Sequence, residues 1–332
     1  MSMPLRYEAY QQTVDRPNVV VDGSPNPATV VTLTHWPGYA SPPGTEADLS
    51  AQMAFRYLDR GADLHGDAEL VTNNHFDQDG LVAVYALSRP EEALARRALL
   101  EDLAAAGDFG TYRSRDAARL SMVVAAYADP DRSPLASLPE DSDELLYREL
   151  LGRLPELVDH PEKERALWED EDRQLDESEA ALASGAVTLT EQPDVDLAVV
   201  DFADPEPHWS GHRFSHQSFE DIHPMAVNNA TDRFALLVVR GRRYHFTYRY
   251  ETWVQYRSRR PKARVELAPL AEELTAVEPG GATWFAEPVG DLAPTLGLVD
   301  GAESGLDRAD VLDRLTHHLK VAPVAWDPYT TA

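Results

Sequence analysis

Apolar and polar positions along the first half of the chain form blocks that indicate strands alternating with helices. Short apolar runs such as NVVVDG and TVVTLTH are bounded by turn-forming residues and are typical of buried strands. Longer segments with helical periodicity follow, and the first of them closes on Gly61. In chain order we predict two strands, a helix, a third strand and two helices, at 18–23, 29–35, 45–61, 68–75, 80–87 and 90–107. This alternation predicts an α/β fold with a mostly parallel sheet.

The second half of the chain has a different pattern. Residues 115–180 are almost continuously helical in periodicity and strongly acidic, which is typical of a solvated helical face. From residue 186 onward β-rich runs predominate, and two of them turn at Gly241 as a hairpin. The sequence therefore predicts an α/β domain over 1–185, with the acidic helical region as an insertion, and a smaller α+β domain over 186–332.

Composition narrows the classes of partner. The chain of 332 residues carries 57 acidic and 30 basic residues, a formal net charge of -27. Because this charge repels polyanions, we expect no long nucleic acid as a partner. Cysteine is absent, which excludes disulfides and thiolate chemistry. No apolar run is long enough to cross a membrane and no basic and apolar leader opens the chain, so we expect a cytoplasmic protein.

The stretch LVTNNHFDQDG, residues 70–80, gathers polar side chains where an apolar run ends. If the extended conformation continued, His75, Asp77 and Asp79 would share one face at the carboxyl end of a strand, where open α/β sheets bind ligands. Two carboxylates and an imidazole so close together favour a divalent cation, and this oxygen-rich set suits Mn²⁺ or Mg²⁺ better than zinc. The alternative is an ordinary turn in which Asp77 caps a helix that starts near Gly80.

The strand, the sequence HFDQDG and the apolar helix LVAVYAL together resemble the first motif of the DHH phosphoesterase superfamily. That resemblance implies manganese ligation by His75, Asp77 and Asp79, hydrolysis of phosphodiesters, pyrophosphates or polyphosphate, and substrate contacts from a second, smaller domain. The family's Asp-His-His triplet is missing, and its Gly-Gly-His loop is not present as such, although HPMA at 223–226 is similar to the tail of that loop. The chain also resembles an uncharacterised group of bacterial proteins that carry HWPG, HFDxDG and HPMA.

Two further residues are candidates for the same cleft. Asp108 follows the helix-ending Gly107 and could complete a metal site, although an ordinary turn aspartate is an equal interpretation. His35 ends a neighbouring strand, and we expect it to face the substrate. We therefore predict a set of metal ligands consisting of His75, Asp77, Asp79 and Asp108, of which His75, Asp77 and Asp79 would also carry catalysis.

Basic residues reverse the local charge of the second half. They are Arg233, Arg240, Arg242, Arg243, Arg249, Arg257, Arg259, Arg260, Lys262 and Arg264. Alternation along the second strand of the hairpin places Tyr244, Phe246, Tyr248 and Tyr250 on one face. Arg249 lies on the other face, which is polar, with His245 and Glu251. Such arginines bind phosphate when they line a cleft, and they equally pair with carboxylates of packed helices. Under the first interpretation we predict substrate contacts from Arg249, His223 and Asn229.

Three histidines spaced at four residues form another candidate group, His208, His212 and His216. On a helix they would stack on one face and suggest a metal site. The glycine and serines among them favour a loop instead.

Two functions follow from these observations. The first is a divalent-metal-dependent phosphoesterase that acts on a small phosphodiester, a pyrophosphate or a short nucleic-acid end, with arginines and histidines of the second domain neutralising the phosphate. The second is a non-catalytic scaffold that binds a nucleotide or a protein partner through the arginine-rich sheet. The intact H-x-D-x-D-G sequence favours the first, and the missing triplet favours the second.

Overall fold

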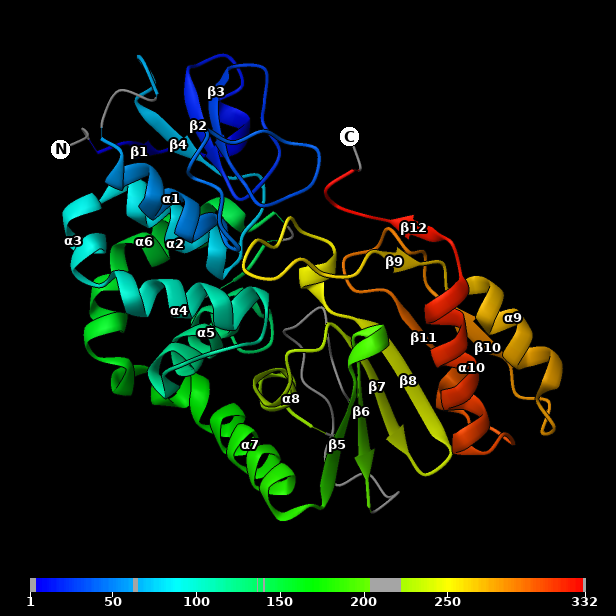
Figure 1. The fold of residues 1–332 in the computed structure, drawn as a ribbon. Coiled ribbons are helices and arrows are strands. Elements are labelled where there is room, and N and C mark those ends of the chain that lie inside the picture. Colours follow the sequence, from blue (N-terminus) through cyan, green and yellow to red (C-terminus); the bar gives the residue numbers. More distant parts are fainter. Residues whose placement is uncertain (1–3, 62–64, 136, 140, 204–221, 331–332) are drawn as a thin grey trace. The chain divides into compact units, whose positions relative to one another are not determined.

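Figure 1 shows the computed structural model, which describes residues 4–61, 65–135, 137–139, 141–203 and 222–330. By its internal contacts the chain divides into two compact units. Unit 1 comprises Met1–Arg173, Tyr256–Arg259 and Ala332, and unit 2 comprises Gln174–Gln255 and Arg260–Thr331. This division falls inside helix α7 (Arg165–Ser184), earlier than the boundary that the sequence suggests near residue 185.

In the described part of unit 1, a parallel four-stranded sheet has the order β1-β4-β2-β3. Its strands are β1 (Arg6–Tyr7), β2 (Asn18–Val21), β3 (Thr29–Leu33) and β4 (Leu70–Thr72). The valines of β2 are fully buried, as their apolar run predicts, and Val19 pairs with Val71 on one side and Val31 on the other. The parallel α/β prediction is confirmed.

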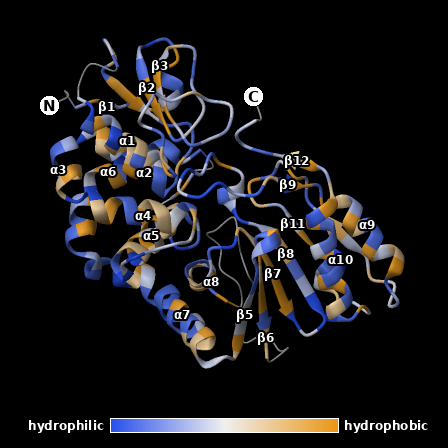
Figure 2. Cartoon of the chain, viewed as in Figure 1, coloured by the Kyte–Doolittle hydropathy of each residue, from blue (hydrophilic) through white to orange (hydrophobic). Residues whose placement is uncertain are grey.

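Helices follow the strands of unit 1 as the apolar periodicity predicts. They are α1 (Ser50–Asp59), α2 (Gln78–Ser88), α3 (Pro90–Ala95) and α4 (Arg97–Asp108). Helix α1 stops before Gly61, whose φ of +86° suits the residue that follows a helix end. Helix α2 is buried along nearly its whole length, and it is largely apolar in Figure 2. The single helix predicted over 90–107 is in fact two, divided at Arg96.

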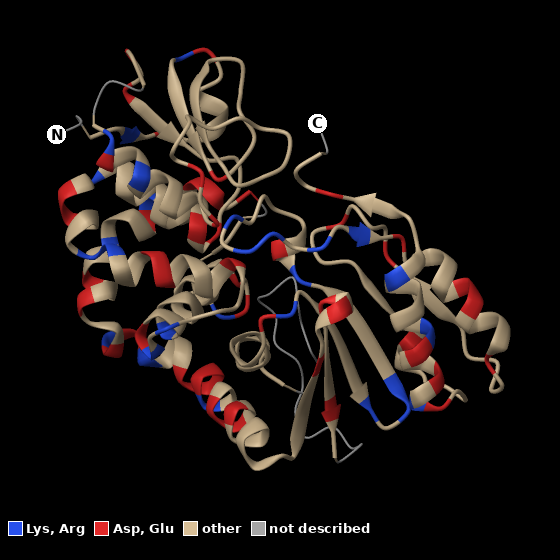
Figure 3. Ribbon diagram, in the orientation of Figure 1, with Lys and Arg blue, Asp and Glu red and all other residues tan. Residues whose placement is uncertain are grey.

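The acidic region of unit 1 is helical, as predicted, and consists of α5 (Arg115–Ala128), α6 (Asp143–Asp159), a 3-10 turn at Pro161–Glu164 and the first half of α7. Figure 3 shows acidic residues along these helices with arginines among them. Some of the acidic residues are buried ion-pair partners rather than part of a solvated face. Asp172 of α7 is 5% exposed and binds Arg115 and Arg119 of α5 at 2.5 and 2.9 Å.

Unit 2 is built on a mixed sheet, which among the described residues has six strands in the order β10-β11-β8-β7-β6-β5. The strands are β5 (Val187–Gln192), β6 (Leu197–Phe202), β7 (Ala235–Arg240), β8 (Arg243–Tyr248), β10 (Trp284–Ala286) and β11 (Thr295–Leu298). Strands β6 and β7 are parallel and the other neighbours are antiparallel. Unit 2 also contains α8 (Pro224–Ala230), α9 (Ala268–Val277), α10 (Arg308–Val321) and the pair β9 (Arg264–Val265) with β12 (Val324–Trp326).

The predicted hairpin is present as β7 and β8, with Gly241 at φ +56° in the turn. Its alternation is also confirmed as far as Tyr248, because Tyr244, Phe246 and Tyr248 lie in one apolar core with residues of α9 and α10. Beyond that point the prediction is wrong. The strand ends at Tyr248, and a 3-10 turn at Tyr250–Thr252 takes its place.

Candidate metal centre

Asp22 stands directly after β2 and has the unusual backbone φ of +49°. Its N–H donates to the carbonyl of Leu33 at 2.9 Å, which holds this left-handed residue against β3. The carboxylate is 1% exposed and accepts a hydrogen bond from the hydroxyl of Ser50 at 2.9 Å. Non-glycine residues held in such a conformation gather at functional sites. The sequence prediction missed Asp22, although its place at the end of an apolar run matches the place of the HFDQDG motif.

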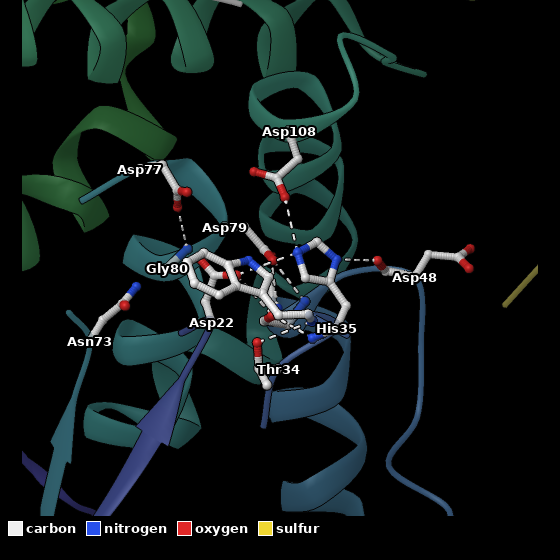
Figure 4. A network of polar contacts seen from close by, with 12 residues as sticks. Asp22, Thr34, His35, Asp48, Asn73, Asp77, Asp79, Gly80 and Asp108 are labelled. Atoms are coloured by element: carbon white, nitrogen blue, oxygen red, sulfur yellow. Dashed lines mark hydrogen bonds and ion pairs between the residues drawn. The ribbon is translucent and has the colours of Figure 1, made fainter. Parts of the chain in front are cut away.

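His35 follows β3 and is also buried, at 1% exposure. Its Nδ1 lies 2.6 Å from the carbonyl oxygen of Asp48, an arrangement in which Nδ1 carries the proton and donates it (Figure 4). Nε2 then presents its lone pair, and it lies 3.5 Å from Oδ1 of Asp22 and 3.5 Å from Oδ2 of Asp108. A carbonyl that fixes the histidine tautomer in this way is the usual support of a metal-ligating imidazole.

Asp79 lies in the first turn of α2 and is fully buried. Its two oxygens accept the backbone N–H groups of Ser50 and Ala51, at 2.7 and 2.8 Å, at the beginning of α1. The positive end of that helix stabilises the negative carboxylate. Each oxygen keeps a second lone pair for another partner.

Asp108 is the last residue of α4, and its side chain is 5% exposed. A carboxylate at the carboxyl end of a helix meets the negative end of the helix dipole. A compensating positive charge is therefore expected near it.

These four residues form what we call the inner group, Asp22, His35, Asp79 and Asp108. One ligand atom from each lies within 4.8 Å of all the others. Figure 4 shows that the residues come from separate elements and point toward one another. Such a group could hold a metal ion.

A second group shares Asp22 with the first. In this outer group, Nε2 of His75 lies 3.3 Å from Oδ2 of Asp22 and 2.8 Å from Oδ2 of Asp77. The side chains of His75 and Asp77 are 30% and 31% exposed, whereas those of the inner group are almost closed to solvent. The outer group is therefore the side of the centre that solvent reaches.

Neighbouring side chains hold the outer group in place. Tyr147 of α6 donates its hydroxyl proton to the carbonyl of His75 at 3.1 Å, and Trp36 stacks on the His75 ring at 5.2 Å between centroids. Gly80 leaves no room for a side chain, because a Cβ there would lie 2.3 Å from Nδ2 of Asn73 and 2.6 Å from the Tyr147 hydroxyl. Close packing thus fixes the loop that carries His75 and Asp77.

Asp77 is also the N-cap of α2, since its Oδ1 accepts the N–H of Gly80 at 2.8 Å. The turn interpretation of this stretch is thus correct for Asp77, and the residue belongs to the outer group as well. The predicted extended alternation is wrong, because β4 ends at Thr72 and Asp79 is already helical. His75, Asp77 and Asp79 nevertheless lie around Asp22, because the helix turn brings Asp79 back toward β2.

The pKa shifts show a centre with excess buried negative charge. Burial, and then the charge of Asp77, raises the pKa of Asp22 above its ordinary value. Burial, and then the charges of Asp22 and Asp77, raises the pKa of Asp79 well above its ordinary value. Burial alone would lower the pKa of His75, but the neighbouring charges of Asp77 and Asp22 raise it to about 11. In each case the shift favours the form that brings a proton, and therefore positive charge, into the centre.

Burial lowers the pKa of His35, which keeps its imidazole neutral and able to ligate. Two carboxylates 4.8 Å apart repel by roughly 3.5 kcal/mol at an effective dielectric constant of about 20. Divalent cations relieve such repulsion. Carboxylate oxygens with one or two imidazoles are ligands that Mn²⁺ and Mg²⁺ accept, so the residues present fit the predicted ions.

The residues of unit 2 that the sequence assigned to the substrate have structural contacts of their own. His223 is 2% exposed, and its Nδ1 accepts the N–H of Met225 at 3.1 Å as the N-cap of α8. Asn229 is exposed on the same helix. Arg249 is buried, pairs with the carboxylate of Glu251 and donates to the carbonyl of Thr231 at 3.3 Å. The expected polar strand face that would present Arg249 is wrong, because β8 ends before it.

Other members of the basic cluster pair within unit 2. Arg233 lies 3.4 Å from carboxylates of Glu191 and Asp196, and Arg242 lies 3.1 Å from that of Asp307. These contacts agree with the internal-pairing interpretation, although the carboxylates belong to unit 2 rather than to the acidic helices. The histidine group His208, His212 and His216 lies outside the described residues.

Fold and site together define an α/β protein with a second, mixed-sheet unit and a buried Asp/His cluster that could hold a metal ion. The chain belongs to the family described as "Family of unknown function (DUF6687)", whose match covers residues 3–330. No curated protein and no solved structure matches this chain. Among the described residues, none of the helices is long and apolar enough to cross a membrane.

Proposed function

We propose that the protein is a divalent-metal-dependent phosphoesterase that uses Mn²⁺ or Mg²⁺ to hydrolyse a small phosphodiester, a pyrophosphate or a short nucleic-acid end. The observation that carries this proposal is the pair of ligand groups that share Asp22. A carboxylate shared between two adjacent ligand sets is the arrangement expected of a phosphoesterase that holds two divalent ions.

Each ligand has a distinct part in this proposal. Asp22 would belong to both groups, while His35, Asp79 and Asp108 would bind on the inner side. A carbonyl and a helix terminus already fix the orientation of His35 and Asp79. His75 and Asp77 would bind on the outer side and leave room for substrate, since both are partly exposed. Bound ions would supply Lewis-acid neutralisation of the phosphate and activation of water.

The resemblance to the DHH phosphoesterases supports phosphorus as the reacting centre. His75, Asp77 and Asp79 match the first motif of that family, and all three lie in the two ligand groups. The chain lacks the later Asp-His-His triplet, but Asp22, His35 and Asp108 supply carboxylate and imidazole groups in its absence. The net charge of -27 favours a small substrate, because a long polyanion would be repelled over its whole length.

The alternative is a non-catalytic scaffold that binds a nucleotide or a protein through the arginines of unit 2. The contacts described for Arg233, Arg242 and Arg249 are with carboxylates of the same unit, which gives this alternative less support. Metal binding without turnover would favour it.

The test combines calorimetric titration of Mn²⁺ with a hydrolysis screen. Wild type should bind Mn²⁺ and hydrolyse at least one of bis(4-nitrophenyl) phosphate, pyrophosphate, a cyclic dinucleotide and a short oligonucleotide. The double variant Asp77→Asn with Asp79→Asn should lose both properties. Asp102→Asn is a matched control, because Asp102 is a buried aspartate of α4 that instead binds the backbone N–H of Arg113 and Ser114.

Equal Mn²⁺ affinity in wild type and the double variant would refute the metal centre. Mn²⁺ binding with no turnover of any of these substrates would replace the enzyme with the scaffold.

A further inference from the structure

A short basic segment contacts Asp48 and Phe109, two neighbours of the inner group, although it is far away in the sequence. Residues Tyr256–Arg259 belong to unit 1, while the chain on either side of them belongs to unit 2. The segment reads YRSR and therefore carries two arginines. Arg257 and Ser258 are exposed, and Tyr256 and Arg259 are partly buried.

Asp48 holds this segment by its carboxylate. Oδ1 of Asp48 accepts the backbone N–H groups of Arg257 and Ser258, at 2.6 and 2.7 Å, and Oδ2 accepts the hydroxyl of Ser258. The carbonyl of the same Asp48 accepts Nδ1 of His35. One residue thus connects the basic segment to a ligand of the inner group.

Aromatic rings make a second connection. Phe109 directly follows the ligand Asp108, and its ring lies 6.1 Å from that of His35. The ring of Tyr256 meets Phe109 edge to face at 5.3 Å. The segment is therefore fixed to the neighbours of two inner ligands by contacts of different kinds.

The charge of the metal centre indicates a role for the two arginines of this segment. The four carboxylates of the centre, those of Asp22, Asp77, Asp79 and Asp108, balance at most the charge of two divalent ions. A phosphate that enters brings further negative charge, so its binding needs cationic groups from outside the ligand set. Arginine is suited to this, because its planar guanidinium binds two oxygens of a phosphate at once.

We propose that Tyr256–Arg259 is the anion-binding segment of the metal centre, that Arg257 contacts a phosphate group of the substrate, and that Asp48 is the positioning residue that holds the segment beside His35. This inference rests on the proposed function and deepens it. It assigns phosphate recognition to a segment of unit 1, rather than to the sheet of unit 2.

The test measures binding of inorganic phosphate to the Mn²⁺-loaded full chain by calorimetry. Arg257→Gln should weaken phosphate binding by about tenfold or more, the loss expected for a charge-assisted hydrogen bond, and should leave Mn²⁺ affinity unchanged. Asp48→Asn should weaken phosphate binding to a similar extent. It too should keep its Mn²⁺ affinity, because the backbone carbonyl that binds His35 is retained.

Arg260→Gln is the matched control. It removes the same charge one residue beyond the segment, from an exposed side chain that pairs with Asp327 in unit 2. This variant should bind phosphate as wild type does. Thermal melting of all three variants separates a local effect from loss of folding.

Wild-type phosphate affinity in both Arg257→Gln and Asp48→Asn would overturn the inference, and so would an equal loss in Arg260→Gln. Failure of the metal centre has a different signature. Phosphate binding that depends on Arg257 but persists without Mn²⁺ would support the anion-binding segment and refute the proposed metal chemistry.

Discussion

Replacing Asp22 by asparagine should leave the metal-free protein at least as stable as wild type and abolish its stabilisation by Mn²⁺. Asp22 belongs to both ligand groups, and its carboxylate is 1% exposed. Asparagine has nearly the same shape, tolerates the φ of +49° and can still accept the hydrogen bond from Ser50. The substitution therefore changes little except the charge.

The magnitude follows from the separation of the carboxylates. Ligand oxygens of Asp22 and Asp79 lie within 4.8 Å of each other, so their mutual repulsion is roughly 3.5 kcal/mol at an effective dielectric constant of about 20 when both are charged, and protonation of Asp79, whose pKa is raised, relieves part of it. Asp22→Asn removes that repulsion, while His75 keeps its closer contact with Asp77 at 2.8 Å. In metal-free buffer the variant should be at least as stable as wild type.

With Mn²⁺ the stability difference between the two proteins should shift toward wild type. An ion at 100 times its dissociation constant adds about 2.7 kcal/mol to the stability of the form that binds it, which raises Tm by about 5–10 °C for a unit of this size. Wild type should show this increase, and Asp22→Asn should show almost none, because both groups have lost their shared ligand.

The assay is a thermal melt monitored by circular dichroism, carried out in chelator and at a series of Mn²⁺ concentrations. Asp102→Asn is the control, and it should be destabilised in chelator and keep its Mn²⁺ response. A full Mn²⁺ response in Asp22→Asn would refute the shared-ligand interpretation. A loss of several kcal/mol in chelator would instead show that the carboxylate is a structural group without excess charge.

Three further outcomes are expected. Gly80→Ala should destabilise by about 1–3 kcal/mol in a chemical denaturation, because its Cβ would lie 2.3 Å from a side-chain nitrogen, whereas Gly152→Ala on open helix surface should stabilise slightly. Mn²⁺ should quench tryptophan fluorescence, and Trp36→Phe should remove most of that quenching, because Trp36 stacks on the His75 ring. Burial raises the pKa of Asp172, but hydrogen bonds from two arginines of α5 lower it by a larger amount. The pKa of Asp172 therefore lies below its ordinary value. Its charged form therefore stabilises the fold at neutral pH, so Asp172→Asn should lower stability by about 1 kcal/mol at pH 7, and the difference from wild type should vanish as the pH falls through the lowered pKa. An unchanged difference at acid pH would contradict this.

Much of the fold of unit 1 could be predicted from the sequence because its signals are local. Three of its strands are bounded by turn residues, and the helices after them have clear periodicity and ends such as Gly61. The strand β1 has two residues and gives no such signal, so it was missed. Arg249 in unit 2 shows a different limit. Apolar and polar residues continue to alternate in the sequence after β8 has ended at Tyr248, so alternation alone does not locate the end of the strand.

The candidate centre was predictable only in part, because it is assembled from separate elements. The HFDQDG stretch indicates His75, Asp77 and Asp79, but the three residues do not share a strand face as the sequence predicts. In the sequence, Asp22 belongs to the Asp-Gly turn that ends NVVVDG. Only the parallel pairing of β2 with β4 places it beside the HFDQDG motif. His35 was expected to face substrate, but packing buries it among carboxylates.

The left-handed backbone conformation of Asp22 restricts which residue types can occupy position 22. Glycine, asparagine and aspartate adopt this conformation at low cost, and larger or β-branched residues do not. A related chain that exchanged the aspartate for asparagine or glycine would keep its fold and lose the ligand common to both groups. Under the proposed function, an asparagine or a glycine at position 22 would therefore mark a family member that does not bind metal.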